Sequence, residues 1–393
     1  MTTDAGPRLP YWRLSAFYLS YFAILGAMLP YWTVFLRARG MSALEIGQLM
    51  AVGTLTRILA PWASAWLGDR VPRRIVVVRA CALLMTVIFC GMFVARGFWP
   101  VALVTAAFGF FWNAALPQFE IVTLRHLGGA GNLYGRIRLW GSVGFIGVVL
   151  GGGWLLQRAG LETLLLVLLA TMVGTLLSSL LVPDRPAPPA VQARASLRGA
   201  LRSPAALGFL AAAFLMQVSH GPYYGFFSIL LEDLGYPRSM VGALWALGVV
   251  AEVGVFLALA RLLPRIGAAR VFLGSLLLAA LRWLIIGHGA ASLPWLLLAQ
   301  VLHAATFGAF HVAALAQVQR FFPAALQGRG QALYSGLCTG GGGALGGVLS
   351  GWLWDTAGAA HVFELAAGAA LLGALLWAGF SRRAAGDARV AAG

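Results

Sequence analysis

Long apolar runs, separated by short turns of charged residues, Gly and Pro, make up almost the whole chain. Each run approaches the roughly 20 apolar residues that an α-helix needs to cross a bilayer. Only 10% of the 393 residues are charged, against about 25% in an average soluble domain. The pattern predicts an all-α integral membrane protein with twelve transmembrane helices. The expected spans cover residues 11–36, 45–67, 75–95, 98–124, 135–156, 161–181, 205–231, 239–261, 268–287, 292–317, 328–353 and 360–380.

The basic residues predict the orientation of these spans. All 28 are arginine, and most lie in alternate loops on the same side as the N-terminus. Since cytoplasmic loops collect basic residues, we expect a multi-pass protein of the bacterial inner membrane with both termini in the cytoplasm. The arginines stand at the ends of apolar runs rather than along one face, so the net charge of +16 indicates membrane topology and not a nucleic-acid partner.

An internal repeat appears when the chain is compared with itself at an offset of 195 residues, at which Gly40 meets Gly235. The same offset superposes the expected spans. We therefore expect two six-helix halves, residues 1–182 and 204–393, joined by a cytoplasmic linker, residues 183–203. Parallel repeats of this kind place a substrate site between the halves, near the bilayer midplane.

Three charged side chains fall well inside expected spans, where an ionisable group is expensive and usually functional. They are Arg57, Glu252 and Arg282, and the repeat carries Arg57 onto Glu252. A carboxyl group in an apolar site can couple its protonation to the other occupant of a cavity, which is the property that a proton symporter needs. The alternative is that Glu252 is a structural partner of Arg57 or Arg282.

Histidines and tyrosines inside the spans are candidates for contact with a substrate. His303 and His311 are eight residues apart, roughly 80° around a helix and 12 Å along it, and each can donate or accept a hydrogen bond. His220 lies beside Gly221-Pro222, a pair expected to loosen its helix where the backbone lines a cavity. The alternative is that these histidines are satisfied core residues. Tyr223 and Tyr224 offer hydroxyl donors and aromatic faces, and Tyr31 is expected to add an apolar wall.

The turn within 65–74 resembles the signature loop of the major facilitator superfamily, which joins its helices 2 and 3. Asp69, Arg70, Arg73 and Arg74 stand at matching positions. The resemblance implies that Asp69, with Arg70 and Arg73, acts as a gate rather than as a substrate site. Ala65 and Pro72 depart from the pattern, which prefers glycine at both positions.

Other stretches resemble the phenylpropionate permease family, relatives of lactose permease that act as proton symporters. Glu120 and Arg138 are similar to the helix 4 glutamate and helix 5 arginine that hold the sugar in lactose permease; a surface salt bridge is the alternative. Arg282 is similar to its helix 9 arginine. The helix 10 histidine and glutamate pair of lactose permease is not reproduced. The stretches that carry the likeness are Leu29–Trp32, Ser219–Gly225, Gly248–Val253, Leu302–His311 and Gln331–Ser335.

These features predict a permease that imports a small organic acid, such as an aromatic carboxylate, together with protons by alternating access. Three arginines against two glutamates leave the expected cavity one net positive charge, which favours a monocarboxylate over a neutral sugar. The alternatives are a proton-coupled sugar or nucleoside symporter, a drug-proton antiporter and a non-transporting receptor.

No constellation for metal, cofactor or enzyme chemistry appears, and the three cysteines have no pairing pattern. We expect a monomer whose partners are the substrate, the proton and the lipid bilayer. Substrate binding is assigned to Glu120, Arg138, Tyr31, His220, Tyr224, Arg282, His303 and His311. Proton coupling is assigned to Glu252, Arg57 and His303, and gating to Asp69, Arg70 and Arg73.

Overall fold

The computed structural model describes residues 9–68, 70–71, 73–128, 133–185, 203–322 and 326–390, with side chains through residue 381. Helices make up most of these ranges, and no strand occurs within them. Eleven helical stretches in the described part of the chain are long and apolar enough to cross a membrane. The predicted class, an all-α membrane protein, is confirmed. Asp69, Pro72 and most of the expected linker lie outside the described residues.

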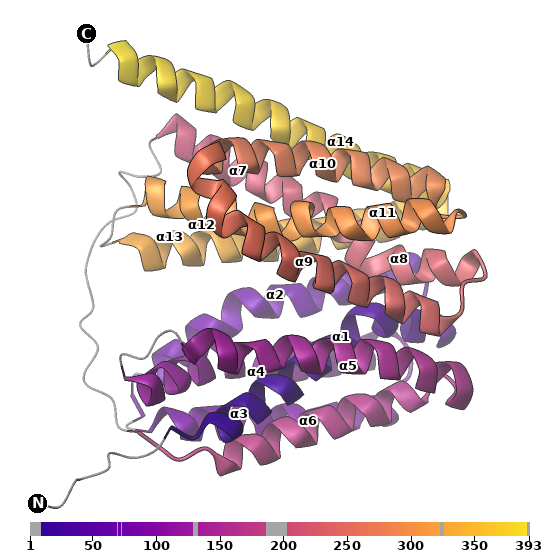
Figure 1. The fold of residues 1–393 in the computed structure, drawn as a ribbon. Coiled ribbons are helices and arrows are strands. Elements are labelled where there is room, and N and C mark those ends of the chain that lie inside the picture. Colours follow the sequence, from indigo (N-terminus) through magenta and orange to yellow (C-terminus); the bar gives the residue numbers. More distant parts are fainter. Residues whose placement is uncertain are drawn as a thin grey trace, which may run out of the picture. The chain divides into compact units, whose positions relative to one another are not determined.

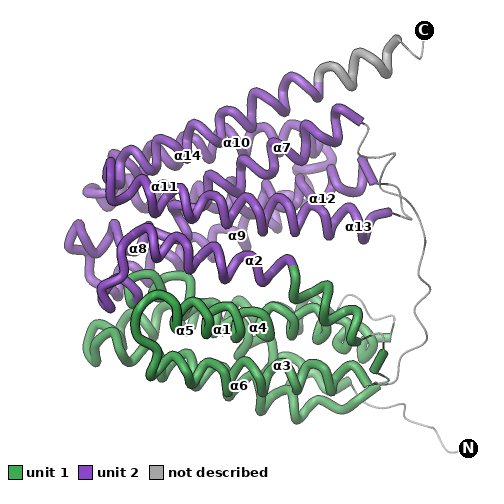
Figure 2. The backbone as a smooth tube through the Cα atoms, turned by 180° about the vertical axis from the view of Figure 1, so that it is seen from behind, with its two compact units in different colours: residues 1–35, 59–191 green, residues 36–58, 192–393 purple. Residues whose placement is uncertain are grey.

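The chain divides into two compact units (Figure 2). The first holds residues 1–35 and 59–191, and the second holds residues 36–58 and 192–393. The helix α2 (Ala43–Gly68) is shared, since its first sixteen residues belong to the second unit. The other elements of the first unit are α1 (Tyr11–Ala38), α3 (Arg74–Phe89), η1 (Cys90–Phe93), α4 (Phe98–Leu127), α5 (Tyr134–Ala159) and α6 (Thr163–Leu181).

Several spans of the second unit are divided into shorter helical segments (Figure 1). Two of its segments, η4 and η6, are π-helical. Its elements are α7 (Pro204–Ser219), α8 (Gly221–Asp233), α9 (Arg238–Ile266), α10 (Ala268–Gly289), α11 (Leu293–His303), η4 (Ala304–Ala309), α12 (Phe310–Phe321), α13 (Gln327–Leu333), η6 (Tyr334–Gly342) and α14 (Gly343–Val390).

Small residues let helices approach closely inside the first unit. A Cβ added at Gly144 of α5 would clash with the backbone of Leu19 in α1, and one at Gly26 of α1 would clash with the backbone of Phe145. Close contact through glycine is a common way to pack helices in lipid, where dispersion forces drive association. The α1–α5 pair therefore depends on glycines from both helices.

The glycine-rich stretch around η6 has the same packing role in the second unit. A Cβ at Gly340 would meet the side chain of Ile58 in α2, and one at Gly346 would meet the carbonyl of Val218 in α7. These glycines therefore allow close helix packing in the second unit. Because α2 packs on this stretch, its first part is assigned to the second unit.

The last apolar stretch, residues 327–381, contains a break at Gly358. This residue has φ 83° and ψ 172°, a backbone conformation that side-chain-bearing residues rarely adopt. The helix direction is therefore free to change inside α14.

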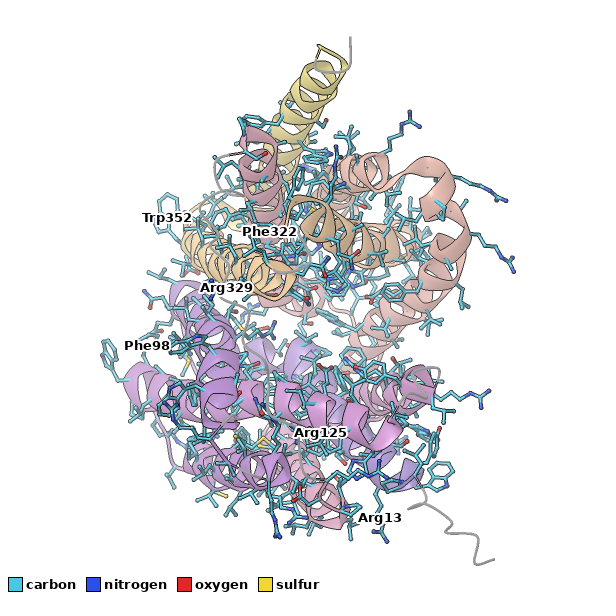
Figure 3. The ribbon with its side chains drawn as sticks, turned by 90° about the vertical axis from the view of Figure 1, so that its left-hand side faces the viewer. Arg13, Phe98, Arg125, Phe322, Arg329 and Trp352 are labelled. Atoms are coloured by element: carbon cyan, nitrogen blue, oxygen red, sulfur yellow. The ribbon has the colours of Figure 1, made fainter. Side chains whose placement is uncertain are left out.

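Large apolar side chains are exposed on both units, as expected of surfaces that face lipid. Trp99 is 79% exposed, Trp62 is 76% exposed and Leu375 is 70% exposed. Trp352 projects from the outer face of α14 (Figure 3). A soluble monomer rarely leaves so much apolar surface uncovered.

Candidate functional site

A carboxyl group and an imidazole meet in the interior of the second unit. The Nε2 atom of His303 lies 2.7 Å from Oε1 of Glu252, and the two side chains are only 6% and 12% exposed. Glu252 stands fourteen residues from each end of α9, about 21 Å from either helix terminus. The pair therefore lies at mid-span. A proton between these two atoms can belong to either group.

Small residues on both helices make this contact possible. A Cβ at Gly248, one turn before Glu252 in α9, would lie 3.2 Å from Cδ2 of His303. A Cβ at Gly308 in η4 would lie 3.6 Å from Cγ of Glu252. The absence of side chains at these positions lets α9 approach the chain around His303. The sequence shows both glycines, but not that they face each other.

Arg282 lies in the same unit and is fully buried. Its Nε atom donates a hydrogen bond to the carbonyl of Ala299 at 2.8 Å, and Nη1 donates to Oγ1 of Thr306 at 3.2 Å. Its Cζ atom lies 4.1 Å from the ring centroid of Tyr223, the range of a cation–π contact. The structure thus places this predicted substrate ligand in the protein core, against backbone and aromatic groups.

Tyr223 links the groups around this buried arginine. Its hydroxyl donates to Oε1 of Gln300 at 2.9 Å, and its ring centroid lies 5.2 Å from that of His303. Both Tyr223 and Gln300 are buried. Gln300 was missed as a site residue, although it stands three residues before His303 and therefore on the same helical face. Thr306 was missed too, because no sequence pattern pairs it with Arg282.

The cluster contains one permanent cation and one group that can lose a proton. The groups are Arg282, Glu252 and His303, and the histidine is in contact with the acid. With a neutral histidine, the cluster has no net charge when Glu252 is ionised and a charge of +1 when Glu252 is protonated. Burial makes such a change of charge costly unless another charge compensates it.

The predicted break before Pro222 is confirmed, because α7 ends at Ser219 and α8 begins at Gly221. Nδ1 of His220 lies 2.8 Å from the carbonyl of Met216, so the histidine forms a hydrogen bond with a backbone carbonyl at the end of α7. A Cβ at Gly221 would clash with the backbone of Gly346. His220 is buried, and its ring packs 6.0 Å from that of Tyr224.

His303 and His311 lie on one face of their span rather than 80° apart. The rings of His303 and Phe307 stack at 5.3 Å, and those of Phe307 and His311 stack at 6.5 Å, both with interplanar angles of 11°. The π-helical segment η4 lies between the histidines. An i→i+5 turn holds one residue more than an α-turn, which reduces the rotation between residues eight apart. His311 is exposed, whereas His303 is buried.

Arg57 stands apart from the buried pair. Its side chain is exposed, and the partner that Glu252 contacts is His303 rather than Arg57. Among the described residues, no ion pair joins Arg57 to Glu252.

In the first unit, Glu120 and Arg138 come together as expected. Oε1 of Glu120 lies 3.8 Å from Nε of Arg138 and accepts a hydrogen bond from the hydroxyl of Tyr134 at 3.3 Å. The Cζ atom of Arg138 lies 4.0 Å from the ring centroid of Phe22. About one third of each charged side chain is exposed, so both keep polar atoms available for a ligand.

Tyr31, a predicted substrate ligand, is buried inside the first unit and bonded to its backbone. It is 1% exposed, and its hydroxyl donates to the carbonyl of Val149 in α5. A Cβ at Gly152 would touch its ring at 3.4 Å. These contacts join α1 to α5.

The arginines of the signature turn contact different partners. Cζ of Arg70 lies 3.6 Å from the ring of Trp66, and Nε of Arg73 lies 3.4 Å from a carboxylate oxygen of Asp184. Arg74 is the buried member, and its Nη1 donates to Oε1 of Gln118 at 2.9 Å. Arg74 was not selected as a gating residue, and nothing in the sequence separates it from Arg73.

Apolar helices with a buried acid, a histidine and an arginine at mid-span define a multi-pass membrane protein of the secondary-transporter class. The chain belongs to the MFS_1 like family, whose profile matches residues 11–365. The members found by comparison are membrane transporters and not enzymes, so the predicted membership of the major facilitator superfamily is confirmed.

Two curated sequences are similar over most of the chain. A probable 3-phenylpropionic acid transporter of Escherichia coli (strain K12) is 34% identical over 87% of this chain and 90% of its own length. The maltose permease of Geobacillus stearothermophilus is 28% identical over 82% of both chains. Among solved structures, a mutant of the nucleoside transporter NupG has a TM-score of 0.84 at 17% identity, and covers 94% of this chain and 99% of that one. The last likeness concerns the fold.

Proposed function

We propose that this protein is a proton-coupled symporter that imports a small organic acid, an aromatic carboxylate related to 3-phenylpropionate, by alternating access. The contact of 2.7 Å between Glu252 and His303 carries this proposal. It provides a protonation site at mid-span, and the permanent charge of Arg282 is buried beside it. The similarity to the phenylpropionic acid transporter supports the substrate class.

Electrostatics supplies a reason for coupling. Proton binding at Glu252 takes the cluster from neutral to a charge of +1, which attracts an anion and is itself favoured by a bound anion. Binding of the two solutes is then mutually reinforcing, since such coupling is reciprocal. A neutral substrate would not compensate the charge in this way.

The proposed topology has twelve spans in two six-helix halves, residues 1–182 and 204–393. A continuous helix over residues 327–381 would be about 80 Å long, more than twice the roughly 30 Å hydrocarbon thickness. The break at Gly358 therefore supports two spans. The arginine distribution supports cytoplasmic termini in a bacterial inner membrane, and we propose that a monomer is sufficient. Asp69, Arg70 and Arg73 are proposed to gate the transport cycle.

Uptake into proteoliposomes tests this function. With an acidic exterior, labelled 3-phenylpropionate should accumulate above its external concentration, and a protonophore should abolish the accumulation. Labelled maltose and uridine should not accumulate. A neutral sugar or nucleoside symporter is the second candidate, because relatives carry those names. Accumulation of maltose or uridine, but not of the acid, would replace the first proposal by the second.

A further inference from the structure

The second unit contains a cavity at the ends of its helices, apart from the buried cluster of Glu252, His303 and Arg282. The cavity has a volume of about 160 Å³, and it is lined by the end of α1, the start of α2 and parts of α8 and α14. None of its lining residues belongs to the buried cluster. An apolar cavity of about 150 Å³ can hold one benzene molecule. The second unit therefore has room for a ring of that size at a second place.

Most of the cavity lining is apolar. Met41, Ile46, Phe226 and Ile229 line it, and all four side chains are buried. Covering apolar surface of this kind stabilises a bound hydrocarbon group by about 25 cal/mol per Å². The lining therefore suits the hydrocarbon part of a ligand.

Two stacked aromatic rings form one wall of the cavity. The ring centroids of Phe226 in α8 and Trp354 in α14 lie 4.9 Å apart, with an interplanar angle of 24°. The indole of Trp354 is only partly covered. An indole attracts both another aromatic ring and a cation, because its faces carry partial negative charge.

The packing of α14 on α2 turns this wall toward the start of α2. A Cβ at Gly351 would clash with the carbonyl of Ala43, the first residue of α2. Trp354 and Asp355 follow Gly351 by three and four residues, so they lie on the same face of the helix. Both residues line the cavity.

The charges at the cavity are not balanced. Arg37, the basic member of the lining, is already joined to Asp233 by two contacts of 2.7 and 2.8 Å. Asp355 is exposed, and its carboxylate forms no hydrogen bond or ion pair with another described residue. One negative charge is thus left without a direct partner, which favours a cationic ligand and disfavours an anionic one.

We propose that this cavity binds a small aromatic amine in its protonated form, with the ring against Trp354 and the ammonium group beside Asp355. An ammonium group has three donors for a carboxylate, and the aromatic wall attracts both its charge and the ring. This site goes beyond the proposed function, since the cavity disfavours the charge of an aromatic carboxylate. In the proposed topology α1 begins in the cytoplasm, so a ligand would reach the cavity at its other end from outside.

Binding of an amine and of its neutral isostere to the purified protein in detergent tests the assignment. The probes are 2-phenylethylamine, a cation at neutral pH, and 2-phenylethanol, which differs from it in charge but little in shape. Isothermal titration calorimetry should show that the wild type binds the amine about fivefold more tightly than the alcohol, the upper value for an exposed ion pair.

Two variants with matched controls locate the site. Asp355→Asn should lower the affinity for the amine to that for the alcohol, whereas Glu364→Gln, which removes the same charge from an exposed side chain outside the cavity, should keep the preference. Trp354→Ala should weaken binding of both probes about tenfold, because it removes the aromatic wall. Trp352→Ala, two residues earlier on the outer face of α14 (Figure 3), should bind both as the wild type does.

Three results would overturn the assignment. They are a wild type that binds neither probe, a wild type that binds the amine and the alcohol equally, and an Asp355→Asn variant that keeps the wild-type preference for the amine. Loss of folding in Trp354→Ala leaves the decision to Asp355→Asn, a small change at an exposed side chain.

Discussion

Nε2 of His303 lies 2.7 Å from Oε1 of Glu252, so an imidazole of α11 and a carboxyl group of α9 share one proton position inside the second unit. Glu252 and His303 are far apart in the sequence, and the fold brings their side chains into hydrogen-bond contact. Each partner stabilises a defined protonation state of the other, because only one proton is needed between them. This contact is the basis for the first prediction.

Replacing Glu252 by Gln should abolish uphill uptake while leaving exchange of substrate across the membrane largely intact. The amide keeps the size of the side chain but cannot bind and release a proton in the transport cycle. Counterflow and proton-driven accumulation, measured in the same proteoliposomes, separate the two activities. Unchanged accumulation would rule out the proposed role of Glu252.

Glu364→Gln is the matched control for that experiment. Glu364 also pairs with a histidine, His288, at 3.0 Å, but these side chains are 43% and 56% exposed. The same chemical change at this exposed pair should leave both uptake and exchange close to wild-type values. A loss of coupling in both variants would point to a general effect of removing a glutamate.

Arg282→Gln should lower the thermal stability of the ligand-free protein. The substitution removes hydrogen bonds from a charged donor to Ala299 and Thr306, and bonds of this kind contribute about 1.5–3 kcal/mol each. Melting in detergent should therefore occur several degrees lower than in the wild type. A variant that melts like the wild type but binds the acid weakly would mean that Arg282 is a substrate ligand after all.

Arg138→Gln should behave differently from Arg282→Gln. Its pair with Glu120 is 3.8 Å long and partly exposed, and exposed ion pairs contribute about 0–1 kcal/mol. The melting temperature should change little, while substrate affinity should fall, because the sequence resemblance assigns Arg138 to substrate binding. Wild-type affinity would leave only the surface salt bridge that the sequence also allowed.

Gly221→Ala should destabilise the protein, because the added methyl group would fall on the backbone of Gly346. Overpacking of this kind costs about 1–3 kcal/mol. Gly225→Ala, four residues further along α8, has nothing within 4 Å of the new Cβ and should be neutral or slightly stabilising through helix propensity. Thermal melting of the two variants compares them directly. Equal melting temperatures would show that α8 and α14 can separate at no cost.

The pair formed by Arg37 and Asp233 should contribute little to stability. Two contacts of 2.7 and 2.8 Å join them, but the side chains are 46% and 42% exposed. Solvent screening limits such a pair to about 1 kcal/mol or less. A double-mutant cycle of Arg37→Gln and Asp233→Asn, followed by thermal melting, measures the coupling. A much larger coupling would indicate that the pair is buried in the assembled state.

Much of the fold followed from local patterns. The apolar runs predicted helices whose ends mostly lie within a few residues of those observed, and the Gly221-Pro222 pair predicted the break between α7 and α8. Helix formation in lipid depends on the apolar length of a segment, since unpaired backbone groups are not tolerated there. Such a property can be assessed one segment at a time.

Side-chain partners could not be predicted in this way. The repeat suggested that Arg57 and Glu252 were counterparts, but Glu252 contacts His303, and no ion pair joins it to Arg57 among the described residues. The positions of His303 and His311 around their helix also differ from the prediction, because an ideal α-helix does not include the π-helical turn between them. Gln300 joined the site through Tyr223, a residue 77 positions earlier.

The sequence by itself determined that this chain enters a membrane as a series of helices, and where charge interrupts them. Both properties depend on the free energy of moving individual segments from water into lipid. Only the tertiary structure decided that Arg282 is buried, that Arg57 is exposed and that Glu252 shares a proton position with His303. Those outcomes depend on which helices pack through glycine and on how each helix is rotated, which are properties of pairs of helices rather than of single segments.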